Sequence, residues 1–359
     1  MATSALDVGD RVARQALVEK PVYIADDSDL DPSFFSNGGL TAGPAPTPAA
    51  QRTFRSQYLI WMNELKNRDC DPVAPSTLAT FESRAKAILS VVGPQTRLVD
   101  FKNAAMAEFV QDAKRFKWAP STLADHIIVI KLIISSATDA EGEELFPRTW
   151  KRRVINAPRV ERDKQHTPCL TRDEVETLLR KAKTEQERLI YAFLCGSGLR
   201  VSEAQAVRFS GNEEQTSWSP ETAVVSVRSG FFRGQDTGRV KTSAGRRNVV
   251  LCGELNQALV AFTSKEKRES GSFLFQSKNG LPLKQSTLRY RMAQHVPDAA
   301  PHAARRFRIS WLRKCRVLEE IIRSQVGHAD ESITDKYSFQ DENTVRSAIE
   351  AAGLGFHLR

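Results

Sequence analysis

The stretch that decides the fold is Gly196–Glu203, which reads GSGLRVSE. It follows the apolar segment Leu189–Cys195, which we interpret as a buried helix that ends at the glycines. Arg200 would then open a new helix, with Glu203 one turn later on the same face. A guanidinium group in this position could bind a phosphate while the carboxylate fixes its orientation. Taken alone, the pattern is more typical of an ion pair on a helix surface.

A second motif lies downstream, in the sequence VKTSAGRRNVVL of residues 240–251. Arg239–Lys241 and Arg247–Leu251 flank a Ser-Ala-Gly turn, which predicts a hairpin with Lys241 near its turn. The tip of a hairpin can reach into a groove of a partner. The alternative interpretation of Lys241 is an ordinary exposed loop lysine.

A third motif, PHAARRF, places His302 and Arg305 three residues apart, on one face of a predicted helix. An imidazole beside a guanidinium group suits a site that needs a cation and a proton acceptor or donor. The same stretch holds further arginines, so a solvated basic helix face is the alternative; these are Arg306, Arg308, Arg313 and Arg316.

A fourth motif, QVGHADESITDKYSF, contains His328 directly after Gly327 and nine residues before Tyr337. The glycine is typical of a helix end, and the tyrosine offers a phenol that could act as a nucleophile. The alternative interpretation of this motif is structural: a capped helix end, then a turn, then a tyrosine whose ring packs against the protein.

Charge is distributed unevenly along the 359 residues. Residues 1–150 carry 16 Lys and Arg against 19 Asp and Glu, a net charge of −3, whereas residues 151–359 carry 36 against 24, a net charge of +12. The whole chain has a net charge of +9 and a pI of about 9.4. An anion-binding surface is therefore expected in the C-terminal part.

The sequence predicts four regions along the chain. Residues 1–50, with an acidic cluster and a Gly/Pro-rich stretch, are expected to form a poorly ordered tail. Residues 51–150 have helical periodicity, because Phe54, Tyr58, Trp61 and Leu65 recur on one face. The polar, basic residues 151–166 are predicted to be a linker. Residues 167–359 begin a mixed α/β pattern with a helix-capping box at Thr171.

The five cysteines are scattered and form no C-x-x-C pair, so neither a disulfide framework nor a structural zinc site is expected. No signal peptide and no apolar run long enough to cross a membrane are apparent in the sequence. Reduced thiols and this composition favour a cytoplasmic protein.

Together, the four motifs resemble those of the phage integrase family of tyrosine recombinases. GSGLRVSE and PHAARRF are similar to the two arginine boxes of that family, VKTSAGRRNVVL to its lysine-bearing hairpin and GHADESITDKY to its final box. LTRDEVETLL, at residues 170–179, is similar to the usual opening of the catalytic domain. One departure is Ala303-Ala304, where the family often has Asp-Leu. Neither of these two positions carries a catalytic side chain in the family pattern.

The resemblance implies an α-helical core-binding domain followed by a catalytic domain of mixed α/β fold, mainly helical with a small antiparallel sheet. It further implies that Tyr337 attacks a DNA phosphodiester to give a 3′-phosphotyrosyl bond, with Lys241 as the general acid and His302 as a proton acceptor. Arg200 and Arg305 would bind the non-bridging oxygens. His328 would add a hydrogen bond, and Glu203 would only support Arg200. No cofactor and no metal ion are expected.

The implied partner is double-stranded DNA, bound by a homotetramer in the synaptic complex, with a monomer or weak dimer when free. The tail after Tyr337, including Val345–Ala352, could dock on a neighbouring protomer. Two alternatives stay open: a type IB topoisomerase that relaxes DNA, and a catalytically inactive DNA-binding relative. A histidine-based metallohydrolase finds little support, because no carboxylate cluster accompanies His302 and His328.

Overall fold

The structure is a computed structural model that describes residues 51–70, 72–161, 167–238, 240, 245–328 and 341–358. The predicted tail at 1–50 lies outside these residues. The chain divides into two compact units, Met1–Gln165 and His166–Arg359, which are described separately here. Within the described residues, no helix is both long and apolar enough to cross a membrane.

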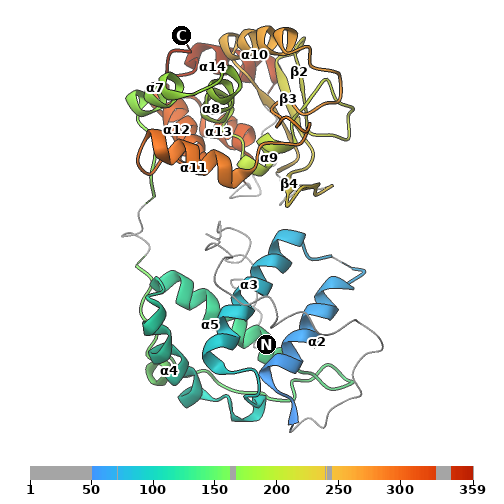
Figure 1. Cartoon of the computed structure of the whole chain (residues 1–359), viewed down its shortest axis with the longest axis vertical. Coiled ribbons are helices and arrows are strands. Elements are labelled where there is room, and N and C mark those ends of the chain that lie inside the picture. The colour runs from blue at the N-terminus through green and yellow to red at the C-terminus, as the bar shows by residue number, and fades with distance from the viewer. Residues whose placement is uncertain are drawn as a thin grey trace. The chain divides into compact units, whose positions relative to one another are not determined.

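The first unit is built from helices (Figure 1). Their bounds are α2 (Phe54–Lys66), α3 (Pro75–Val92), η4 (Leu98–Asp100), α4 (Asn103–Asp112), η5 (Ala113–Phe116), α5 (Pro120–Ser135) and α6 (Arg152–Ile155). The helix α2 begins at a capping box in which Thr53 and Ser56 satisfy each other's backbone N–H groups. Both α3 and α5 begin with a proline, whose missing N–H costs nothing at this position.

The core of this helical unit forms where the apolar faces of α2, α3 and α5 meet. The four residues that the periodicity of the sequence assigned to one face of α2 are all buried: Phe54, Tyr58, Trp61 and Leu65. The apolar run of α5 supplies Ile130 and Ile133, which have no exposed surface. A largely buried ion pair, between Arg84 of α3 and Asp125 of α5 at 2.8 Å, joins these two helices.

The predicted linker, 151–166, begins inside the helical unit. Residues Arg152–Ile155 form α6, and Ile155 is buried in the core of this unit with Ala157 packed against it. The apolar side chains of this otherwise basic stretch therefore dock on the helices before them, and the connecting segment starts later than the sequence predicted. Residues 162–166 lie outside the described residues.

The second unit is a mixed α/β fold, mainly helical, as the sequence predicted. Its helices are α7 (Arg172–Lys181), α8 (Glu185–Ser197), α9 (Val201–Ala206), α10 (Gly253–Lys265), α11 (Gln285–His295), α12 (Pro301–Lys314), α13 (Glu319–Val326) and α14 (Glu342–Ala352). The predicted capping box at the start of α7 is present, because Thr171 and Glu174 bond each other's backbone. The helix α8 is central to the core, and Tyr191, Phe193 and Leu194 on it have no exposed surface.

The small sheet of this unit has the strand order β1-β2-β3-β6. Its strands are β1 (Arg208–Phe209), β2 (Ser217–Ser219), β3 (Val224–Val227) and β6 (Arg247–Val250). The pairs β2–β3 and β3–β6 are antiparallel, as predicted, but the two-residue β1 runs parallel to β2. In Figure 1 the helices of the unit gather to one side of β2 and β3.

Of the predicted hairpin around Lys241, the first arm and the turn lie outside the described residues, apart from Val240 and Gly245. Within the described residues, the strand β6 pairs with β3. Between β3 and β6 the chain forms a separate two-stranded ribbon of β4 (Phe231–Phe232) and β5 (Gln235–Asp236). The ribbon packs beside α9. No pattern in the sequence predicted this ribbon.

The end of the chain is built into the second unit of the same protomer. The guanidinium group of the buried Arg308 donates to the carbonyl of Gly353 at 2.6 Å, and the indole of Trp311 donates to the carbonyl of Ala352 at 2.8 Å. Both donors lie on α12, and both acceptors lie at the end of α14. In this structure α14 therefore docks on its own domain, whereas the sequence suggested a neighbouring protomer for Val345–Ala352.

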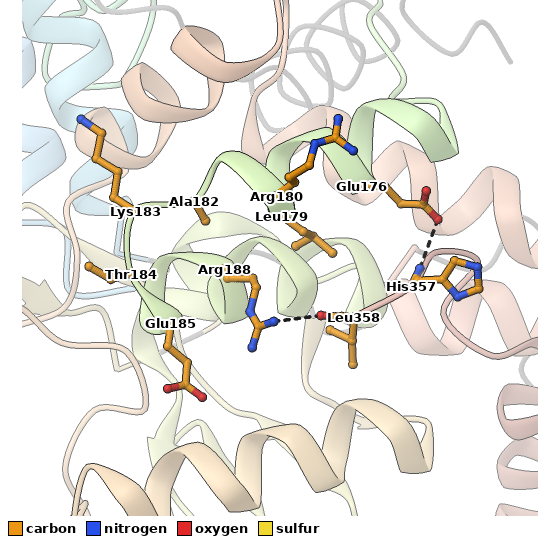
Figure 2. A pocket seen from close by; sticks show the side chains of 10 residues that line it. All are labelled: Glu176, Leu179, Arg180, Ala182, Lys183, Thr184, Glu185, Arg188, His357 and Leu358. Atoms are coloured by element: carbon orange, nitrogen blue, oxygen red, sulfur yellow. Dashed lines mark hydrogen bonds between the residues drawn. The ribbon is translucent and has the colours of Figure 1, made fainter.

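The last residues close one side of a pocket of about 670 Å³ beside α7 and the start of α8 (Figure 2). The backbone N–H of His357 donates to Glu176 at 3.3 Å, and Arg188 donates to the carbonyl of Leu358 at 3.1 Å. The lining combines basic and acidic side chains and includes none of the predicted catalytic residues. These contacts fix the C-terminal segment in place.

Candidate active site

The first arginine of the site stands where α8 gives way to α9. The helix α8 ends at Gly198, which has a left-handed φ of 68°, and Arg200 is the N-cap residue of α9. Glu203, one turn into α9, accepts the backbone N–H of Arg200 at 2.9 Å and its Nη1 at 2.8 Å. The carboxylate predicted to support Arg200 therefore does so through two bonds.

The second arginine comes from α12, which begins at Pro301. His302 lies in its first turn and Arg305 one turn later, as the spacing predicted. The Arg305 side chain is only 3% exposed, and its Nη1 donates to the carbonyl of Gly198 at 2.9 Å. Because Gly198 has a left-handed φ and a β-carbon there would lie only 3.2 Å from the stem of Arg308, a larger residue would be strained at this turn.

Both arginines also bind the end of α13. Arg305 Nη2 donates to the carbonyl of Val326 at 2.5 Å, and Arg200 Nη2 donates to the carbonyl of Gly327 at 3.1 Å. Gly327 ends the helix in a left-handed conformation with a φ of 68°, and His328 follows it. Four predicted site residues, distant in sequence, are thus brought together: Arg200, His302, Arg305 and His328.

The charges in this cluster do not balance. Arg200, Arg305 and Arg247 surround the single buried carboxylate of Glu203, so three positive charges face one negative charge. Burial alone would raise the pKa of Glu203, but the hydrogen bonds and charges of Arg247 and Arg200 outweigh burial and lower it. Burial and the charge of Arg200 lower the pKa of Arg305 to about 9. The excess of positive charge, about +2, creates a site that attracts an anion.

The two histidines are neutral at neutral pH in this cationic setting. Burial and the charges of nearby arginines, Arg306 first, lower the pKa of His302 to about 4. Burial and the charges of Arg305 and Arg200 likewise lower the pKa of His328 to about 4. Both side chains are nonetheless exposed on the surface of the second unit. A neutral imidazole can accept a proton, whereas an imidazolium cannot.

We therefore expect the imidazole signals of His302 and His328 in NMR spectra of the DNA-free protein to titrate with midpoints near pH 4. Since histidines of the unfolded chain take up protons near pH 6.5, the free energy of unfolding should fall as the pH drops from about 6.5 to about 4. His302→Gln should reduce that dependence. A bound phosphate ester should raise both midpoints, because an anion favours the charged imidazolium. Midpoints at or above 6.5 in the free protein would contradict this account.

Two predicted site residues, Lys241 and Tyr337, lie outside the described residues. Their roles stay predictions from the sequence. In the parts of the chain that the structure describes, no group of three or more His, Cys, Asp or Glu side chains could hold a metal ion.

One residue of the cluster was missed from the sequence. Arg247, the first residue of β6, donates from Nη2 to Glu203 at 2.9 Å and from Nη1 to the other carboxylate oxygen at 3.2 Å. Both side chains of this ion pair are almost fully buried, at 6% and 5% exposure. The sequence feature that could have identified Arg247 is a charged residue at the start of an apolar strand. Such a residue needs a partner of opposite charge when it is buried.

Comparison with known proteins gives a family for the second unit. Residues 168–343 match the family model described as "Phage integrase family". This match spans all the site residues above and most of the second unit. Residues 168–343 therefore form a domain of the phage integrase family of tyrosine recombinases. No curated protein matches the sequence.

Several solved structures share the fold. The Tn1549 transposon integrase in complex with transposon right end DNA is 17% identical, with a TM-score of 0.58 over 83% of this chain and 99% of that chain. A lambda integrase dimer bound to a COC′ core site is 15% identical, with a TM-score of 0.55 over 81% and 98%. A lambda integrase tetramer bound to a Holliday junction has a TM-score of 0.54 at 15% identity, over 81% of this chain and 80% of that chain. At these identities the likeness establishes the fold.

Proposed function

We propose that the chain is a site-specific recombinase that cleaves and rejoins duplex DNA through a 3′-phosphotyrosyl bond to Tyr337. The observation that carries this proposal is the pair of arginines, Arg200 and Arg305, held by the ends of three helices in a cluster with excess positive charge. Such a cluster suits the phosphodiester of a DNA backbone. The +12 charge of residues 151–359 favours the same partner.

In the proposed reaction the phenolic oxygen of Tyr337 bonds to phosphorus while the bond from phosphorus to the 5′ oxygen breaks. The phenol has a pKa of about 10 when unperturbed, so it needs a base, and the neutral imidazole of His302 takes its proton. Lys241 protonates the departing 5′ oxygen. The products are a 3′-phosphotyrosyl protein and a free 5′-hydroxyl, and the reverse attack by another strand's 5′-hydroxyl rejoins the DNA.

The two arginines act on the non-bridging oxygens, where negative charge accumulates in the pentacoordinate transition state. Each guanidinium is already fixed by backbone carbonyls, so little reorganisation is needed as that charge develops. His328, which follows Gly327 at the end of α13, would donate a further hydrogen bond. Neither metal nor cofactor enters this scheme.

The assembly proposed on DNA is a homotetramer that joins two duplexes, with a monomer or weak dimer when free. It is supported by the fold shared with lambda integrase, whose tetramer was solved on a Holliday junction. The helical unit would hold the duplex together with the catalytic unit, and the proposed compartment is the cytoplasm. Residues 1–50 would be dispensable for cleavage, and the connecting residues would span the two DNA-bound units.

The test begins by selecting binding duplexes from a randomised pool with the full chain. Two plasmids that carry a selected site and different flanking markers are then incubated with the protein. We expect molecules in which the flanks of the two plasmids are joined, together with a trapped covalent adduct. Relaxation of supercoils without any exchange would favour a type IB topoisomerase. Binding with neither adduct nor exchange would make the chain an inactive relative.

A further inference from the structure

Arg247 connects two parts of the site that the mechanism above treats separately. It spans four acceptors: the two carboxylate oxygens of Glu203 and the backbone carbonyls of Gln325 and Gly245. The bond from its Nε to Gln325 is 2.8 Å long. Each planar nitrogen of the guanidinium group is used, a pattern that lysine cannot reproduce.

On one side, Arg247 fixes the carboxylate that orients Arg200. Glu203 accepts two hydrogen bonds from Arg200 and two from Arg247, so each carboxylate oxygen is bound by both arginines. Without Arg247, this buried carboxylate would keep only Arg200 as a charged hydrogen-bond partner, and its position would no longer be set by the strand β6. If the Glu203 carboxylate is free to move, it cannot hold the planar guanidinium group of Arg200 in one position.

On the other side, Arg247 fixes the end of α13. Gln325 accepts from Arg247 through its backbone carbonyl and from the backbone N–H of Val250 through its side chain at 3.0 Å. The next two residues are Val326 and Gly327, whose carbonyls bind the two catalytic arginines. A shift of this helix end would therefore displace both acceptors and the histidine that follows them.

We propose that Arg247 is a positioning residue of the phosphate site: it fixes Glu203 and the end of α13, and through them the guanidinium groups of Arg200 and Arg305. It touches neither the phosphate nor the nucleophile in this role. The proposal rests on the proposed function, because it concerns how well the cleavage site is assembled. The simpler view is that Arg247 and Glu203 only stabilise the fold as a buried ion pair.

A double-mutant cycle separates these two views. Arg247→Lys and Arg200→Lys are made singly and together, and single-turnover formation of the covalent adduct is measured at saturating protein on a duplex selected from the randomised pool. Each single variant should slow cleavage by roughly 10²-fold, as small misplacements of catalytic groups do. The double variant should be slowed little more than the worse single variant, because both changes damage the same group. The affinity for the duplex should change much less.

A buried arginine of the helical unit provides the matched control. Arg84, 8% exposed, is paired with Asp125 at 2.8 Å, so Arg84→Lys also disturbs a buried ion pair. We expect Arg84→Lys to lower the unfolding midpoint but to leave the saturated cleavage rate unchanged, alone or combined with Arg200→Lys. Assays are run well below every unfolding midpoint. If Arg247→Lys does not fold, Glu203→Gln, which keeps the shape of the side chain, takes its place in the cycle.

The outcomes are distinct. Losses that multiply in the double variant, or a cleavage rate that Arg247→Lys leaves intact, would overturn the positioning role while leaving the proposed function in place. A wild-type protein that binds the selected duplex but forms no adduct would overturn the proposed function and this inference with it. A non-additive cycle, together with an unchanged cleavage rate in the Arg84→Lys control, supports both the positioning role of Arg247 and the proposed function.

Discussion

Tyr337→Phe should abolish covalent attachment to DNA while leaving binding to the duplex almost unchanged. The substitution removes one oxygen atom, the proposed nucleophile, and keeps the ring. None of the other proposed site residues carries a hydroxyl group that could attack the phosphate, so we expect no adduct above background. The duplex is labelled at the 5′ end of the cleaved strand, because that fragment stays on the protein. Denaturing gels then report the adduct, and gel shifts report binding.

The other tyrosines of the described residues make this test selective. Tyr58 and Tyr191 are buried, and Tyr191 donates its hydroxyl to Glu187 at 2.6 Å. Burial raises the pKa of Tyr58 to about 12, which leaves even less phenolate than usual. Tyr290 is 65% exposed on α11, so Tyr290→Phe is the matched control and should keep the adduct. An adduct that persists in Tyr337→Phe and disappears in Tyr290→Phe would reassign the nucleophile.

The parts of the fold that follow from local chemistry were predictable from the sequence. The periodicity that placed Phe54, Tyr58 and Trp61 on one face of a helix identifies the core of the helical unit, because burial imposes that spacing. The capping box at Thr171 marks the start of α7 for an equally local reason. Neither inference needs knowledge of distant contacts.

The long-range parts of the structure were harder to predict. The ribbon of β4 and β5 turns through Arg233 and Gly234, which both have positive φ angles of 47° and 86°. Arginine gives a weak signal for such a turn, where Asn-Gly or Asp-Gly would have been strong. The strand β6 was predicted, but its partner was not, since register depends on residues far apart in sequence.

The candidate site shows the same division. Arg200, His302, Arg305 and His328 could be found because their order and local spacing resemble a family pattern. Arg247 could not, because its importance lies in reaching a carboxylate 44 residues away and a carbonyl 78 residues away. Its buried ion pair is a property of the folded chain that no local pattern shows.

The general acid is the role with the sharpest chemical test. Lys241 is assigned to it by its match to the lysine of the family's hairpin, since it lies outside the described residues. An alkoxide is a poor leaving group and gains much from protonation in the transition state, so Lys241→Ala should slow cleavage of ordinary DNA by about 10²- to 10⁴-fold. A thiolate is far less basic and gains little. When sulfur replaces the scissile 5′-bridging oxygen, Lys241→Ala should therefore cleave at nearly the wild-type rate.

The discriminating comparison is with Arg200→Ala on the same two duplexes. Arg200 is proposed to stabilise the non-bridging oxygens, and its defect should persist on the sulfur-bridged duplex, because the charge on those oxygens still develops. Single-turnover adduct formation measures all four rates. Equal rescue of Lys241→Ala and Arg200→Ala would show that another group is the acid. Arg246 would be a poor substitute as the general acid, because a guanidinium group does not release its proton at neutral pH. His302 would then be the leading candidate, and its neutral state in the free protein means that it would first have to gain a proton when DNA binds.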